Sequence, residues 1–188
     1  VGGHNFGALL GGKIHSLGLK ANLTAWAWGY NLEGQCGDGT ITNRSSPVSV
    51  VGGHNFIALT ADALRSLGLK ENGTAWGWGS NISGEIGDGT VAARSSPVSV
   101  IGAHSFIELA GNQYHSLGRK ADGTVWAWGL NSSGELGDGT VLSRSSPVSV
   151  IGNHSFLSIK GGLYYSLGLK ADGTAWAWGQ HGNGQLGN

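Results

Sequence analysis

The sequence predicts an all-β protein, a β-propeller made of four repeats of about 50 residues that each form a four-stranded blade. Residues 51–100 and 101–150 align without a gap and share 30 identical positions, so they must adopt the same local structure. Glycine accounts for 36 of the 188 residues. This is about 19% against a usual roughly 7%, which indicates frequent turns. No segment has a sustained helical period.

The second repeat shows the elements expected in each copy. A strand is predicted at 56–59, and the runs 66–70 and 75–79 flank an Asn-Gly corner. Such a corner between two short alternating runs is the strongest short-range signal of a β-hairpin. A further strand is predicted at 97–100, because a leading proline suits the start of a strand. In the first repeat the corner is Asn22-Leu23, which we expect to be more strained or differently shaped.

Four short strands per repeat fit either a stacked β-solenoid or a propeller blade, and the length of the repeat favours the propeller. A Trp-x-Trp pair recurs in the same strand of every copy. Residues at i and i+2 lie on one face of a strand, so we expect the rings to pack between neighbouring blades. These structural tryptophans are Trp26, Trp28, Trp76, Trp78, Trp126, Trp128, Trp176 and Trp178.

We expect one repeat array over residues 1–188, with copies at 1–50, 51–100 and 101–150 and a shorter last copy at 151–188. The Ser-Ser-Pro-Val-Ser-Val segment ends only the first three copies, so three such strands serve four copies. An unpaired sheet edge invites association. The sequence therefore predicts either part of a larger ring or a ring completed by another chain, with self-association as a consequence.

The residues 122–140 read AspGlyThrValTrpAlaTrpGlyLeuAsnSerSerGlyGluLeuGlyAspGlyThr, and SerSerProValSerVal follows at 145–150. In this order of motifs, which covers all four copies, the chain resembles the repeat of the regulator of chromosome condensation family. The resemblance implies a β-propeller, usually of about seven blades. The chain departs from the family where alanine is usual, and there we expect glycine to weaken the strand slightly. The glycines concerned are Gly18, Gly68, Gly118 and Gly168.

Several functions are excluded by what the sequence lacks. Lys plus Arg and Asp plus Glu both number 11, so the neutral chain has no basic surface for nucleic acid. No apolar run is long enough to insert into a membrane. The repeats bring no titratable groups together and contain no phosphate-binding loop at a helix N-terminus, so we expect no enzyme activity and no cofactor.

Two repeated motifs invite a metal-site interpretation that their chemistry does not support. One histidine recurs at the same position of each copy: His4, His54, His104 and His154. Equivalent atoms of neighbouring blades lie too far apart to share an ion, so we expect structural hydrogen bonding, with contact to a ligand as the lesser alternative. Gly-Asp-Gly-Thr recurs at 37–40, 87–90 and 137–140. It supplies one carboxylate per copy, which predicts a turn and no metal.

Differences between the copies mark the candidate binding residues. The turn before the Ser-Leu strand differs in every copy, as does the segment after Trp-Gly. Diverse side chains on loops of a rigid frame suit a recognition surface, although drift on exposed turns would produce the same pattern. The candidate partner-binding residues are Lys13, Ile14, His15, Leu64, Arg65, Gln113, Tyr114, His115, Leu163, Tyr164 and Tyr165.

The sequence thus predicts a non-enzymatic interaction module that binds a protein or glycan through variable loops on one face. The alternative is a guanine-nucleotide exchange factor or another regulator acting on a small GTPase, the activity best known in the family, although a fold does not fix a function. The single cysteine, Cys36, leaves the redox compartment undecided. An extracellular or bacterial cell-surface location is favoured.

Overall fold

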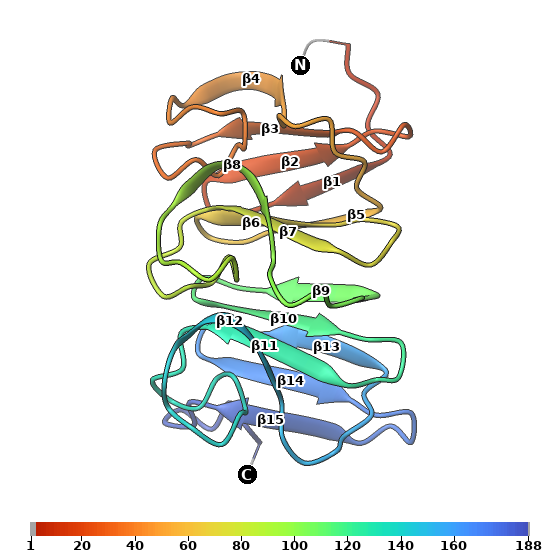
Figure 1. Ribbon diagram of the computed structural model, residues 1–188, viewed down its shortest axis with the longest axis vertical. Helices are drawn as coiled ribbons and strands as arrows, with labels where there is room; N and C mark the ends of the chain where they lie inside the picture. The colour runs from red at the N-terminus through yellow and green to blue at the C-terminus, as the bar shows by residue number, and fades with distance from the viewer. Residues whose placement is uncertain (1–2, 188) are drawn as a thin grey trace.

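The computed structural model describes residues 3–187, which form fifteen β-strands and no helix. The strands make three four-stranded sheets and one three-stranded sheet, all antiparallel and arranged one after another from the N-terminal to the C-terminal end (Figure 1). Each sheet is one blade, and successive strands within it are neighbours. The prediction of an all-β propeller architecture is confirmed.

The blades are numbered in chain order. Blade 1 contains β1 (Ala8–Gly11), β2 (His15–Leu19), β3 (Ala25–Gly29) and β4 (Arg44–Ser49). Blade 2 contains β5 (Ala58–Ala61), β6 (Arg65–Leu69), β7 (Ala75–Gly79) and β8 (Arg94–Ser99). Blade 3 contains β9 (Glu108–Gly111), β10 (His115–Arg119), β11 (Val125–Gly129) and β12 (Arg144–Ser149). Blade 4 contains β13 (Ser158–Gly161), β14 (Tyr165–Leu169) and β15 (Ala175–Gly179).

The predicted hairpin corners join the second strand of each blade to the third. Asp122 Oδ1 accepts hydrogen bonds from the Thr124 amide at 2.9 Å and the Thr124 hydroxyl at 2.7 Å. Gly123 follows Asp122 with a φ of 83°, a conformation that costs glycine little. In the first repeat Leu23 takes this place with a φ of 66°, so the first corner carries backbone strain that the others avoid.

Two strand boundaries differ from the sequence prediction. The strand expected at 56–59 begins later, as β5, because the Phe56 amide donates to the Leu23 carbonyl at the corner of blade 1. The strand expected at 97–100 begins earlier, as β8, because Arg94 already pairs with Gly79. Pro97 therefore lies inside a strand, which β8 tolerates because it is the outer strand of its sheet.

The glycines that replace the family's usual alanine are required by the packing within each blade. A Cβ atom built on Gly118 would lie 2.7 Å from two ring atoms of Phe106, and one on Gly68 would lie 2.5 Å from the Phe56 ring. The phenylalanine ring thus occupies the space that a side chain would need. Besides the slight weakening of the strands that was expected, these glycines make room for the core.

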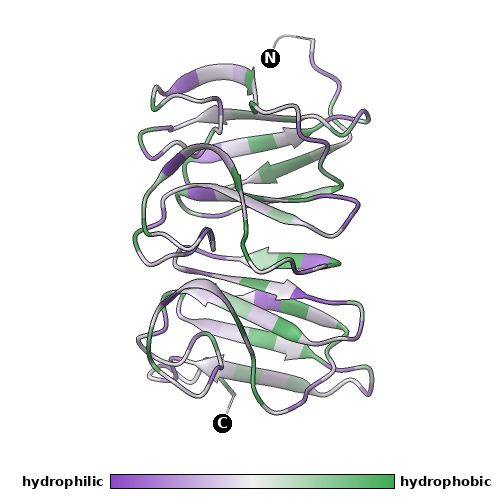
Figure 2. Cartoon of the chain, in the orientation of Figure 1, coloured by the Kyte–Doolittle hydropathy of each residue, from purple (hydrophilic) through white to green (hydrophobic). Residues whose placement is uncertain are grey.

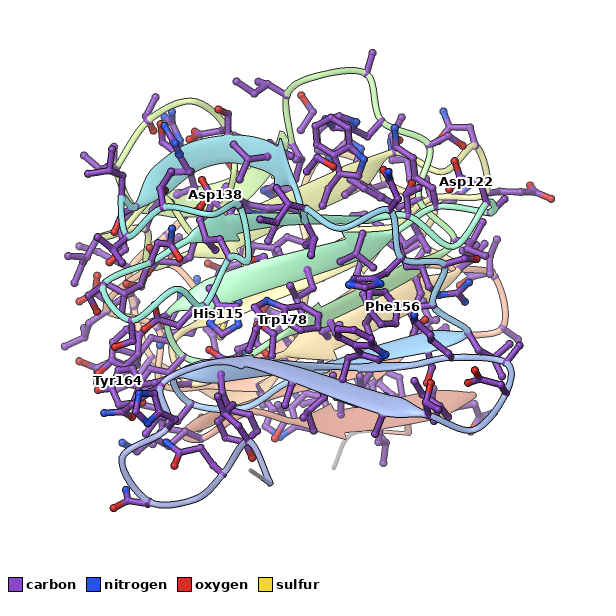
Figure 3. All side chains as sticks on the ribbon, turned by 90° about the horizontal axis from the view of Figure 1, so that it is seen from below. His115, Asp122, Asp138, Phe156, Tyr164 and Trp178 are labelled. Atoms are coloured by element: carbon purple, nitrogen blue, oxygen red, sulfur yellow. The ribbon has the colours of Figure 1, made fainter. Side chains whose placement is uncertain are left out.

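The hydrophobic core lies between the blades, and hydrophobic stretches run along the strands of every sheet (Figure 2). The second tryptophan of a pair is central to it: Trp78 and Trp128 are fully buried, and Trp178 packs beside Phe156 between blades 3 and 4 (Figure 3). The first tryptophans are less enclosed, and Trp176 is 43% exposed. The remaining pair, Trp26 and Trp28, is only partly buried on the outer side of blade 1. Of the described residues, none forms a helix long and apolar enough to cross a membrane.

Candidate interaction surface

The predicted binding turns lie together at one end of the strands. Each turn joins the first strand of a blade to the second, and the segment after Trp-Gly leaves the third strand at the same end (Figure 1). Tyr164 marks this end in Figure 3, and Asp122 marks the opposite end. We call the end that carries turns 12–14, 62–64, 112–114 and 162–164 the turn face.

The turn face separates the candidate residues into two groups. Most are accessible: Lys13, Ile14 and Leu163 are exposed, and Leu64, Gln113, Tyr114, Tyr164 and Tyr165 are half-buried. The other three, His15, Arg65 and His115, are buried. They begin the second strand of their blades, where the side chain points toward the next blade. Their expected role in binding a partner is therefore wrong, because no partner can reach them.

The buried histidines tie neighbouring blades together. His15 Nε2 lies 2.9 Å from Ser66 Oγ, and this hydroxyl donates to the Gln35 carbonyl at 2.9 Å. One hundred residues further along the chain, His115 Nε2 lies 2.8 Å from Ser166 Oγ, which likewise donates to a backbone carbonyl of the preceding blade. A variable position of the sequence thus carries an interaction that holds the blades in register.

Arg65 replaces histidine in the tie between blades 2 and 3. Its guanidinium forms a buried ion pair with Asp62, at 2.9 Å. It also donates to the carbonyls of Glu85 at 3.1 Å, Asn112 at 2.8 Å and His115 at 2.6 Å. Burial raises the pKa of the Asp62 carboxyl, and the positive charge of Arg65 opposes that shift. The arginine thus satisfies one carboxylate and three carbonyls at this interface.

Burial lowers the pKa of His15 from 6.5 to about 4. Burial also lowers the pKa of His115, with a further contribution from the charge of Arg65, to about 3. Both imidazoles are therefore neutral in the folded protein at neutral pH. A neutral ring can donate its Nε2–H to the serine oxygen, whose own proton goes to the backbone carbonyl, without bringing an unpaired charge into the interface.

We expect the free energy of unfolding to fall as the pH drops below the unfolded-state histidine pKa of 6.5. Below this pH the unfolded chain binds protons that the folded chain excludes, so stability present above 6.5 is lost until the pH reaches the folded values of about 4 and about 3. By about pH 4.5 each histidine should account for a loss of about 2 to 3 kcal/mol. Urea denaturation at the two pH values measures the loss.

A variant with His15→Gln and His115→Gln separates this effect from the titration of carboxylates. It should lose most of the change in stability between neutral pH and about pH 4.5. The matched control is His181→Gln, because His181 is exposed and ties no blades together. An equally steep pH dependence in the double variant would show that the buried histidines do not control acid stability.

The outward residues at the last position of each turn form a row across the turn face, which we call the apolar row: Ile14, Leu64, Tyr114 and Tyr164. The rings of Tyr114 and Tyr164 stack with centroids 5.3 Å apart, and Gln113 donates to the Tyr114 hydroxyl at 2.7 Å. The row thus presents two aliphatic and two aromatic side chains, one from each blade.

The backbone beneath the apolar row is fixed in every blade by the same contact. The carbonyl of Ile14 accepts a hydrogen bond from the Tyr30 amide at 2.9 Å, and the other three turns repeat this bond at 2.9 Å. Gly29, at a φ of 111°, makes the close approach possible, since a Cβ there would lie 2.8 Å from the Ile14 carbonyl oxygen. The side chains of the row therefore vary, whereas the backbone beneath them is the same in all four blades.

The loop after Trp-Gly is held by an asparagine that the sequence interpretation overlooked. Asn31 is buried, its Oδ1 accepts from the Cys36 amide at 2.8 Å, and its Nδ2 donates to the Thr42 carbonyl at 3.1 Å. Asp38, in Gly-Asp-Gly-Thr, caps its own turn and pairs with Arg44. The motif is a turn, as predicted, and its carboxylate already binds the Thr40 amide and Arg44. The recurrence of Trp-Gly-x-Asn was the signal for this role.

The opposite end of the strands carries a repeated stack instead of varied side chains. His54 packs against Trp76 with ring centroids 4.2 Å apart, and Lys70 Nζ lies 4.4 Å from the centre of the same indole. Burial, and then the charge of Lys70, lowers the pKa of His54. All four copies contain this stack, so the recurring histidines make aromatic contacts where hydrogen bonds were expected. Within residues 3–187 no three potential metal ligands cluster.

The fold and the repeated interior define an array of propeller blades. A sequence model described as the regulator of chromosome condensation (RCC1) repeat matches residues 122–169, and a second model of that description matches residues 106–135. Residues 106–169 thus match the RCC1 repeat, as the motifs of the sequence predict. No curated protein sequence gives a significant match to the chain.

Solved structures match almost the whole chain. Human WBSCR16 has a TM-score of 0.85 at 22% identity, over 98% of this chain and 50% of its own. The complex of Kap60 with yeast RCC1 (Prp20) gives 0.86 at 21% identity, over 100% and 46%. Prp20p from Saccharomyces cerevisiae, described with its binding to Gsp1p and histones, gives 0.81 at 20% identity, over 100% and 48%. The chain spans about half the length of these structures, and the likeness concerns the fold.

Proposed function

We propose that the chain is a non-enzymatic interaction module that binds a protein partner through the apolar row of the turn face. The observation that carries the proposal is the contrast between side chain and backbone in this row. Ile14, Leu64, Tyr114 and Tyr164 differ between blades, whereas the hydrogen bond beneath each of them is the same. Variation of outward side chains on a fixed frame suits recognition.

The chemistry of the row favours a protein over a glycan. Tyrosine is enriched at protein interfaces, and aliphatic side chains such as Ile14 and Leu64 pair with apolar groups of a partner. Sugars bind through free aromatic faces, and Tyr114 and Tyr164 stack on each other. Because the turns are already fixed, a partner would order few backbone groups on binding.

The experiment compares two double variants with the unmodified chain. Tyr114→Ser with Tyr164→Ser removes the aromatic half of the row, and Ile57→Ser with Ile107→Ser removes two exposed apolar residues elsewhere on the surface. Partners are crosslinked, identified by mass spectrometry and purified for affinity measurement. We expect the tyrosine variant to bind at least about tenfold more weakly, and the isoleucine control to bind normally. Equal affinities in both variants would refute the assignment of the row.

A second candidate function is regulation of a small GTPase. The structural likeness to Prp20p, whose structure is described with its binding to Gsp1p, favours it. Release of a fluorescent nucleotide from a small GTPase, measured with and without the chain, separates the two candidates. Acceleration of release would replace the proposal of a non-enzymatic module, and an unchanged rate together with partner binding would support it.

A further inference from the structure

The interfaces between blades follow one design, with a receiving face and an inserting face. In the first interface, Leu17 and Ala27 of blade 1 form the receiving face, and Phe56 and Trp78 of blade 2 insert against it. All four side chains are fully buried. The two later interfaces repeat the arrangement around Trp128 and around Leu117, Ala127 and Phe156.

One face of each kind is uncovered in the described chain. The inserting face of blade 1 consists of Phe6, Leu9 and Trp28, and Leu9 is 68% exposed where its counterpart Leu59 is 7% exposed. The receiving face of blade 4 includes Leu169, which is 39% exposed. Its counterpart in blade 2, Leu69, is only 2% exposed. These faces are the two ends of the array seen in Figure 1.

The receiving face of blade 4 contains a hollow of about 250 Å³ lined by Leu167, Leu169 and Ala175. The corresponding residues of blade 1, Leu17, Leu19 and Ala25, belong to the core cluster that contains Phe56. Phe6 is the equivalent of Phe56 in the sequence and is only partly buried. The hollow and the ring are thus the two halves of a contact that the chain already makes internally.

Polar groups at the two ends correspond in the same way. At the first interface, the Gln35 carbonyl accepts hydrogen bonds from Ser66 Oγ at 2.9 Å and from Trp78 Nε1 at 2.9 Å. Gln185 occupies the position of Gln35 in blade 4. The donors that would correspond to Ser66 and Trp78 are Ser16 and Trp28 of blade 1.

We propose that the occupant of the receiving face is the inserting face of a second copy of this chain, so that copies associate head to tail. The internal interfaces identify the occupant, because each exposed residue at one end has its buried partner at the other. Such an interface is heterologous: every copy contributes one face to each of two contacts. The proposal is independent of the turn face, whose apolar row stays free.

The test uses sedimentation of the full chain and two charge variants. Leu9→Asp places a carboxylate on the inserting face, and Ala175→Arg places a guanidinium on the receiving face. Both positions are exposed in the single copy, so the variants should fold. We expect the unmodified chain to form larger species as its concentration rises. Each variant should associate about a hundredfold more weakly, because an unpaired charge would be buried.

A mixture of the two variants gives the sharpest result. The Leu9→Asp copy keeps its receiving face and the Ala175→Arg copy keeps its inserting face, so the mixture should form a one-to-one dimer although neither variant associates alone. Ile82→Asp is the control, because Ile82 is exposed on a loop outside both faces, and it should associate normally. An unmodified chain that stays monomeric, association that survives both substitutions, or a mixture that stays monomeric would overturn the proposal.

Discussion

Replacing Trp78 with alanine should lower the free energy of unfolding by about 3 to 5 kcal/mol. The ring is fully buried among residues of blade 1 that include Leu17 and Cys36, and its Nε1 donates to the Gln35 carbonyl at 2.9 Å. Alanine would leave a cavity between blades 1 and 2 and remove the donor to that carbonyl. Urea denaturation followed by circular dichroism measures the loss.

The chain supplies a matched control in the last blade. Trp176 is the first tryptophan of its pair and is 43% exposed. Trp176→Ala should therefore cost about 1 kcal/mol, because much of the ring already contacts water and a truncated side chain there leaves no closed cavity. Similar losses for Trp78→Ala and Trp176→Ala would contradict the view that the second tryptophan of a pair locks the blades.

Much of this fold could be predicted from the sequence because the repeat multiplies each local signal. The Asp-Gly corner at 122–123 and the alternating runs beside it suffice to place a hairpin, and the 50-residue period places the others. The start of β8 was mispredicted because Pro97 was read as a strand start. Its place within an outer strand depends on pairing with β7, which a local pattern does not reveal.

The sequence located only part of the candidate surface, again because a local pattern does not reveal contacts between repeats. Sequence variation located the turns, and it could not separate Tyr114, which points outward, from His115, which ties two blades. The partner of His115 is Ser166, one repeat further on, in a segment that reads the same in every copy. The exchange of histidine for Arg65 likewise resembles drift in the sequence, because only the structure shows its ion pair with Asp62.

The outward and the inward residues of the turn face have different roles. Outward residues of the apolar row can vary with a partner, because nothing in the blade depends on them. Inward residues can change only if the interface gains new hydrogen bonds, as Arg65 does with Glu85 and Asn112. The change from histidine to arginine therefore distinguishes the interface of blades 2 and 3 from its neighbours and makes it the one that depends on a buried charge.

Replacing Arg65 with alanine should lower the free energy of unfolding by about 3 to 5 kcal/mol. The change would leave the buried Asp62 carboxylate without the cation that lies 2.9 Å from it. It would also remove the donors to the carbonyls of Glu85, Asn112 and His115. Urea denaturation at pH 7 measures this loss, and a smaller difference from the unmodified chain at lower pH would show that protonation of Asp62 relieves part of it.

A double variant distinguishes a lost tie from a general packing defect. Asp62→Gly with Arg65→His reproduces the residues found at positions 12 and 15 of blade 1, where His15 bridges to Ser66. The introduced imidazole would face Ser116, the equivalent serine of blade 3, and the buried Asp62 carboxylate would be gone. We expect this double variant to recover most of the stability that Arg65→Ala loses. If it is no more stable than Arg65→Ala, or if Arg65→Ala costs less than about 1 kcal/mol, the ion pair is not what joins these two blades.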